Sequence, residues 1–169
     1  MVENLPDLYR ATHEAGHFVM AYFVWLDIAP ICECEEPPLN SVTISSSRNY
    51  LGSCDKNRRS WKEMRERRPE AAIAVNQAGR FATELFTQPV PDFWHEDDEQ
   101  RVEGILSLFP QDREQLLTRA QQYLDRLREE RWCNAIRAVA ENLCQSKTLT
   151  WAQVGSIIGA RSVRVGGPR

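Results

Sequence analysis

The sequence predicts a mainly helical α+β fold with one small β-sheet, and three observations support that prediction. Most of the chain places apolar residues three and four positions apart, which is typical of amphipathic helices. One stretch, around residues 41–54, instead resembles a pair of short strands. The 169 residues, 42% of them apolar, are enough for one domain with a hydrophobic core.

The first half of the chain alternates between these two patterns, with prolines marking the breaks. We expect a helix from Pro6 to Trp25, followed by an acidic, proline-rich loop at residues 30–38. Strands should follow at residues 41–45 and 50–54, around a turn at Arg48 and Asn49. Helical segments should run from Ser60 onward, the second beginning at Pro69 and reaching Leu85.

The second half is expected to be helical after a loop at residues 87–94. The predicted elements are a helix opened by Asp97 or Asp98 and ended by Pro110, a helix from Arg113 to Arg128 capped by Asp112, a helix around residues 132–143, and a last helix capped by Thr148 or Thr150 and stopped by Gly159.

The pentapeptide His13-Glu14-Ala15-Gly16-His17 has the form H-E-x-x-H and lies inside the first expected helix. Residues four apart share a helix face, so both imidazoles can point at one ion. A catalytic zinc ion takes such a pair with a third protein ligand and keeps an open position for water. Glu14, next to the first ligand, can reach that water. The motif predicts a metal-dependent hydrolase, most often a peptidase.

The alternative interpretation is a pair of surface histidines that flank a solvated glutamate. The neighbouring residues argue against it, because Ala11, Ala15, Phe18 and Val19 have the spacing of a buried helix. Buried histidines and a buried glutamate need polar partners, which a metal ion would supply.

Charge and hydropathy narrow the range of partners. With 24 acidic and 21 basic residues, the net charge of −3 gives no case for nucleic acid. The basic run at residues 56–68 is interleaved with glutamates, which favours a solvated helix face. The N-terminus lacks a signal-peptide pattern, and no stretch reaches the roughly 18 to 20 apolar residues that span a bilayer. We therefore expect a cytoplasmic protein without a transmembrane segment.

The five cysteines are odd in number and scattered, which favours reduced thiols over a disulfide framework. A disulfide or an accessory metal at Cys32-Glu33-Cys34 is the alternative.

The third ligand of the predicted zinc site must come from outside the H-E-x-x-H motif. Its candidates stand together at residues 95–99, His-Glu-Asp-Asp-Glu. Some of these acids would in any case complement the dipole of the helix that follows.

Several landmarks besides the motif resemble a known family, in the family's order. Residues 41–44 and 50–52 resemble its strand pair, and the sequence A-G-R-F-A-T-E-L at 78–85 resembles its G-G-R-A-A-E-E-L helix. Residues 98–102 resemble its D-x-x-R-A segment, and 148–151 resemble its closing T-L-x-x-x-E/Q-I element. The family is the peptidase domain of the FtsH-type AAA+ zinc metalloproteases.

This resemblance implies a helical zincin-type peptidase domain over residues 1–160, with residues 161–169 as a flexible C-terminal tail. It implies one zinc ion per chain, held by His13 and His17 with an aspartate, and Glu14 as general base. The implied activity is hydrolysis of peptide bonds in unfolded or flexible protein segments. A strand beside the cleft could bind the polypeptide substrate by strand addition.

The resemblance carries the third ligand onto Asp98. Asp97 is adjacent and ranks second, and His95, which is chemically an equally good ligand, ranks third. A carboxylate that completes a two-histidine site is ordinary for zinc.

The sequence also departs from the family. It contains no G-x-x-x-x-G-K-[ST] phosphate loop and no membrane anchor, so it resembles the peptidase half alone. A separate unfoldase or ATPase is then a candidate partner. Related domains form hexameric rings, which leaves a homo-oligomer and a monomer both open. The competing hypotheses are a catalytically silent metal-binding interaction module and a repressor-cleaving factor of another H-E-x-x-H family.

Overall fold

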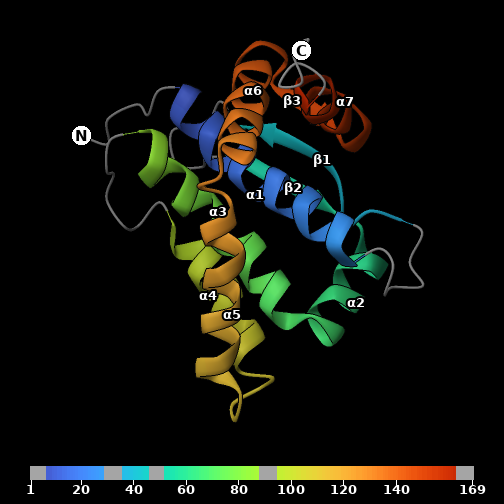
Figure 1. The fold of residues 1–169 in the computed structure, drawn as a ribbon. Coiled ribbons are helices and arrows are strands. Elements are labelled where there is room, and N and C mark those ends of the chain that lie inside the picture. The colour runs from blue at the N-terminus through green and yellow to red at the C-terminus, as the bar shows by residue number, and fades with distance from the viewer. Residues whose placement is uncertain (1–6, 29–35, 46–51, 88–94, 163–169) are drawn as a thin grey trace, which may run out of the picture.

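The computed structural model describes residues 7–28, 36–45, 52–87 and 95–162 (Figure 1). Within them the fold is mainly α-helical with one small antiparallel sheet, which confirms the predicted fold class. The helices are α1 (Asp7–Ile28), α2 (Arg58–Arg67), α3 (Pro69–Phe86), α4 (Glu96–Leu106), α5 (Arg113–Arg126), α6 (Glu130–Ser146) and α7 (Trp151–Ser162). The strands are β1 (Leu39–Ile44), β2 (Gly52–Lys56) and β3 (Thr148–Thr150).

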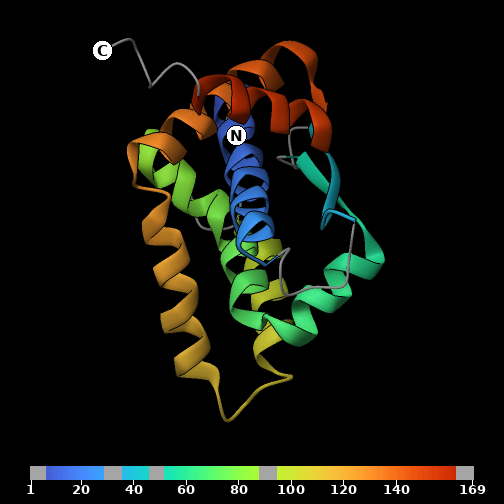
Figure 2. The ribbon, with the colours of Figure 1, turned by 45° about the vertical axis from the view of Figure 1, so that its right-hand side comes forward.

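Helix α1 lies in the middle of the molecule, between α3, α6 and the sheet (Figures 1 and 2). Its side chains at Ala11, Ala15, Phe18 and Val19 are fully buried, as their spacing predicted. Because apolar residues occupy most of its circumference, α1 is covered on several sides. The H-E-x-x-H motif is therefore in the interior of the molecule.

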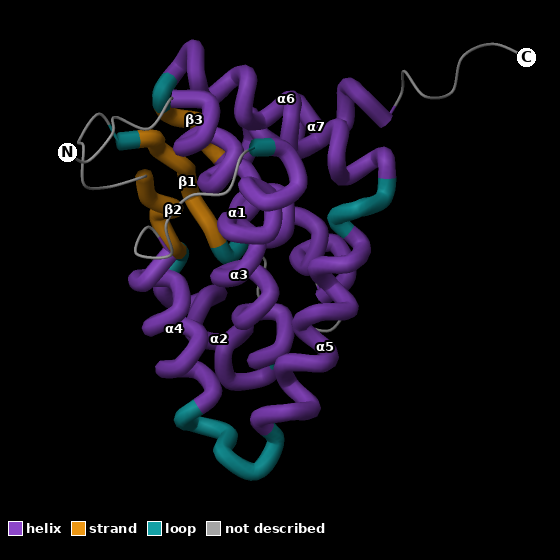
Figure 3. Tube along the Cα trace, turned by 90° about the vertical axis from the view of Figure 1, so that its left-hand side faces the viewer, coloured by secondary structure: helices purple, strands orange, loops and turns teal. Residues whose placement is uncertain are grey.

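The sheet has the strand order β2-β1-β3 and lies against one side of α1 (Figure 3). Val42 of β1 pairs with Cys54 of β2 on one side and with Leu149 of β3 on the other. The two strands expected from the sequence are β1 and β2. Since β1 is the central strand, the open edges among the described residues belong to β2 and β3.

Strand β3 was not predicted, because three residues are too few to show alternation. Pairing with β1 makes it a strand, and the Thr43 and Thr148 hydroxyls hydrogen-bond across that pair at 3.0 Å. Thr150, one of the two predicted caps, does cap α7. Its hydroxyl accepts from the Gln153 N–H at 3.3 Å, while its own N–H donates to the Gln153 side chain at 2.8 Å.

The prediction that Gly159 ends the last helix is wrong, because α7 continues to Ser162. A glycine costs a helix only about 1 kcal/mol relative to alanine, which does not stop it by itself. The expected tail at 161–169 thus begins inside α7. Residues 163–169 lie outside the described part of the chain, as do the turn at 48–49 and most of the two predicted loops.

The remaining helices begin and end near their predicted positions, and Asp112 stands at the N-cap of α5 without a side-chain cap hydrogen bond. Helix α2 presents the expected solvated face, with ion pairs from Arg59 to Glu63 and from Lys62 to Glu66. None of the helices in the described ranges is both long enough and apolar enough to cross a membrane.

Candidate metal centre

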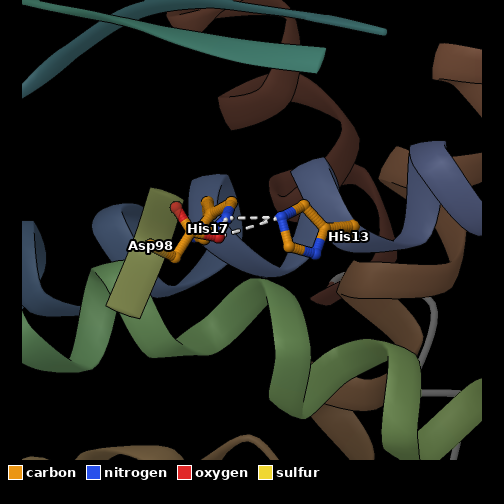
Figure 4. A group of neighbouring side chains, drawn as sticks. All are labelled: His13, His17 and Asp98. Atoms are coloured by element: carbon orange, nitrogen blue, oxygen red, sulfur yellow. Dashed lines mark hydrogen bonds and ion pairs between the residues drawn. The ribbon is translucent and has the colours of Figure 1, made fainter. Parts of the chain in front are cut away.

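Side chains from two helices converge where α1 passes the first turn of α4 (Figure 4). Nε2 of His13 lies 3.0 Å from Nε2 of His17, and Oδ2 of Asp98 lies 3.1 Å from both nitrogens. All three residues are buried. Tetrahedral zinc with bonds of about 2.0–2.1 Å has ligand atoms about 3.3 Å apart. The three donor atoms therefore come close to three corners of such a tetrahedron.

The chemistry of this donor set fits a divalent metal ion. Two imidazole nitrogens that face each other and one carboxylate oxygen need a cation between them, either a proton or a metal ion. Among the described residues, these three form a group of metal-type ligands whose donor atoms converge. Two histidines and one carboxylate are an established zinc ligand set.

Two of the three side chains are oriented by a further hydrogen bond. Nδ1 of His17 donates to the carbonyl of Val75 in α3 at 2.6 Å, which leaves the Nε2 lone pair directed at the cluster. Arg101 donates to Oδ1 of Asp98 at 3.0 Å, so that Oδ2 faces the histidines. Nδ1 of His13 is buried and has no hydrogen-bond partner among the described residues.

Two glycines leave the space that this arrangement needs. A Cβ on Gly79 of α3 would overlap Nε2 of His17 and lie 2.6 Å from Cε1 of His13. A Cβ on Gly16 would overlap the carbonyl oxygen of Ala78 in α3. No local pattern in the sequence indicates the direct contact of Gly79 with the histidine rings.

Glu14 is buried and faces β2. The Cys54 thiol donates to Oε2 of Glu14 at 3.5 Å, and a Cβ on Gly52 would lie 2.7 Å from Cγ of Glu14. Burial raises the pKa of Glu14 to about 7. Near neutral pH this carboxyl can therefore both accept and release a proton. The contact with Cys54 was missed, since nothing in the sequence links a strand cysteine to the motif.

The two histidines differ in their protonation. Burial lowers the pKa of His13 to about 4, so this ring is neutral at pH 7. Burial alone would lower the pKa of His17 as well, but the Asp98 carboxylate overrides it and raises this pKa to about 9. Burial would raise the pKa of Asp98, yet His17 holds it well below its usual range. In the absence of metal, His17 and Asp98 form a buried ion pair.

The other two candidates for the third ligand are not among the residues whose donor atoms converge. Asp97 is exposed on the outer side of α4. His95 is buried, but its Nε2 lies 3.4 Å from the Tyr9 hydroxyl and its ring stacks on His13 with 5.3 Å between centroids. The structure thus brings Asp98, the first-ranked candidate, to the two histidines. That it binds a metal stays a prediction.

Comparison with known proteins adds no family assignment to this geometry. No protein-family model matches the chain, and no curated protein matches it. The resemblance to FtsH-type peptidases stays a prediction from the motifs, and the function is proposed from the site itself.

Proposed function

We propose that this protein is a zinc-dependent endopeptidase in which Glu14 is the general base. The observation that carries the proposal is the convergence of His13, His17 and Asp98, with donor atoms 3.0 and 3.1 Å apart, next to a buried glutamate. An H-E-x-x-H hydrolase needs these parts in this relation.

The residues divide the chemistry among them. A zinc ion held by His13, His17 and Asp98 would lower the pKa of water to about 7 and polarise the scissile carbonyl. Glu14 takes the proton from the attacking water and passes it to the leaving amine nitrogen. Its pKa of about 7 suits both transfers. Gly52 and Cys54 hold the carboxylate in a buried position.

The sheet supports a polypeptide as the substrate. Among the described residues, β2 pairs with β1 on one side only, and its residues Gly52 and Cys54 contact Glu14. A peptide that added to the open edge of β2 would run past the general base. Only an unfolded or flexible segment can supply such a strand, and a separate unfoldase would widen the range of substrates.

Metal content is the first test. The purified protein should contain about one zinc ion per chain, and His17→Ala and Asp98→Ala should each lose it. Asp97→Ala is the matched control, since it removes a neighbouring carboxylate from the exposed side of the same turn. His95→Ala should also keep the metal. Zinc lost from Asp97→Ala but kept by Asp98→Ala would overturn this ligand set.

Cleavage of an unstructured fluorogenic peptide is the second test. Glu14→Gln should keep the zinc and lose turnover by at least about a hundredfold, since general-base catalysis contributes on that order. Turnover equal to wild type would contradict the role of Glu14. A wild-type protein that holds zinc but cleaves nothing would instead favour a metal-binding interaction module.

A further inference from the structure

A second group of charged side chains lies next to the candidate metal centre, and the proposed mechanism does not use it. Alternation along β2 puts Lys56 on the same face as Cys54, whose thiol contacts Glu14. Lys56 lies over the ring of Trp61 in α2, and Arg65 follows Trp61 by about one helical turn on the same face. The charges of Arg65 and of Arg101 in α4 both act on Lys56. Three cations from three elements therefore lie near the candidate site.

These cations have few carboxylates to pair with. Arg101 donates to Oδ1 of Asp98, whose other oxygen faces the histidines. Lys56 has no ion pair with any residue that the structure describes, and its Nζ lies 4.1 Å from the centre of the Trp61 ring. Arg65 likewise has none in the described ranges, and its Nε is buried without a hydrogen-bond partner.

The surroundings of Lys56 disfavour its positive charge. Burial, and after it the charge of Arg101, lowers the pKa of Lys56 to about 8, although Cys54 and Asp98 oppose the shift. Like charges that lie near one another repel, and a nearby anion relieves that repulsion. Carboxylates form strong, short hydrogen bonds with both guanidinium and ammonium groups. Among the described residues, Lys56 and Arg65 are thus the members of this group without a carboxylate partner.

The distance from Cys54 to Lys56 along β2 indicates where such a carboxylate would lie relative to the scissile bond. A strand rises about 3.3 Å per residue, so Lys56 lies roughly 7 Å from Cys54 along the edge. A substrate strand beside β2 that presents its scissile bond to Glu14 would bring a side chain about two residues away close to Lys56.

We propose that Lys56 and Arg65, together with the outer N–H groups of Arg101, form a subsite for an acidic side chain of the polypeptide substrate. The position of this subsite relative to the scissile bond rests on the proposed peptidase function. Its affinity for a carboxylate does not, so binding and cleavage test the two proposals separately.

The test measures binding to the zinc-loaded Glu14→Gln variant, which would not consume the peptide. The probes are two fluorescein-labelled, C-terminally amidated flexible peptides of equal length, one with two aspartates and one with asparagines in their place. Because both C-termini are amidated, the two peptides differ only in their side-chain carboxylates. Fluorescence anisotropy should show the aspartate peptide binding about tenfold more tightly, as one charge-assisted contact can give.

Further substitutions in the Glu14→Gln variant test which residues cause the tighter binding of the aspartate peptide. Lys56→Gln and Arg65→Gln should each remove most of it, and Lys56→Arg, which keeps the charge, should restore it. Lys62→Gln is the matched control, because Lys62 is an exposed lysine of α2 paired with Glu66. Equal binding of the two peptides, or an equal loss in Lys62→Gln, would overturn the subsite.

Cleavage of the same peptides by the wild-type protein separates the two proposals. Cleavage without any preference for aspartate, together with equal binding, overturns the subsite and leaves the peptidase. Binding that depends on aspartate and on Lys56, without cleavage of any peptide, supports the subsite and counts against the peptidase.

Discussion

The two sides of helix α3 are packed in opposite ways. Toward α1, the small residues Ala78, Gly79 and Ala82 bring the helices so close that a Cβ on Gly79 would overlap a candidate metal ligand. Toward α5, the start of α3 borders an open cleft of about 820 Å³, lined mostly by polar and charged side chains such as Arg68 and Tyr123.

The closer packing lies on the side of α3 where the positions of the candidate metal ligands must be precise. Metal ligands must be held within about 0.5 Å of a working geometry, which requires close contact and few alternative side-chain positions. The α5 side has no such demand, and its partly exposed ion pairs and hydrogen bonds contribute modestly to stability. Substitutions on the α1 side should therefore change zinc binding, and those on the α5 side should change only stability.

Gly79→Ala should have the largest effect. The new methyl group would overlap the His17 ring, so the protein should lose its zinc and about 1–3 kcal/mol of unfolding free energy. Zinc analysis and urea denaturation measure the two losses. Gly104→Ala in α4 is the control, since no neighbouring atom of the described residues would lie within 4 Å of the new Cβ. It should stabilise the protein by about 0.5–1 kcal/mol. Normal zinc content in Gly79→Ala would show that the contact between α1 and α3 is looser than the structure indicates.

Arg101→Gln should weaken zinc binding by about 10- to 100-fold, as the loss of a group that orients a ligand does. The variant removes the donor that holds Oδ1 of Asp98 at 3.0 Å. Competition with a fluorescent zinc chelator measures the affinity. Arg113→Gln, which breaks an exposed pair with Glu103, should leave it unchanged. Equal affinities in all three proteins would mean that Asp98 needs no orienting partner.

Zinc affinity should rise with pH, because His17 must lose its proton to bind. With a pKa of about 9 in the metal-free protein, His17 is protonated at pH 6 and should release about one proton per zinc ion. His13, with a pKa of about 4, should release none. Calorimetry in buffers of different ionisation enthalpy counts the protons, and affinity should rise about tenfold per pH unit up to about 9.

The raised pKa of His17 also makes the stability of the metal-free fold depend on pH. The folded-state pKa of His17 lies above its ordinary value of 6.5, so the charged ring stabilises the metal-free fold fully below about pH 6.5. This contribution is lost as the pH rises through about 9. Zinc affinity that did not change between pH 6 and 8 would contradict the buried ion pair of His17 with Asp98.

Tyr123→Phe should have the smallest effect. It removes the hydroxyl that accepts a hydrogen bond from Arg68 at 2.6 Å in the cleft, which should cost about 1 kcal/mol of unfolding free energy. Zinc affinity should not change. A loss of zinc in this variant would show that the two sides of α3 are coupled.

Much of the fold follows from local pattern. Helical spacing predicted α1, α3 and α6, because packing of an apolar face is what stabilises each of them. The short strand β3 and the continuation of α7 past Gly159 were missed, since pairing with β1 and the weak penalty of one glycine are not visible in a short stretch.

The spacing of His13, Glu14 and His17 along one helix turn is a local property, so the sequence was enough to predict that the two histidines share a face with Glu14 beside them. The resemblance ranked Asp98 above Asp97 as the third ligand. The approach of α4 to α1 puts the Asp98 carboxylate beside the histidines, while Asp97 is exposed. Packing between elements creates the contacts of Gly79 with the histidine rings and of Cys54 with Glu14, and it brings Lys56 near Arg65 and Arg101. Contacts between elements distant in the chain depend on how closely those elements pack, and no local pattern carries that distance.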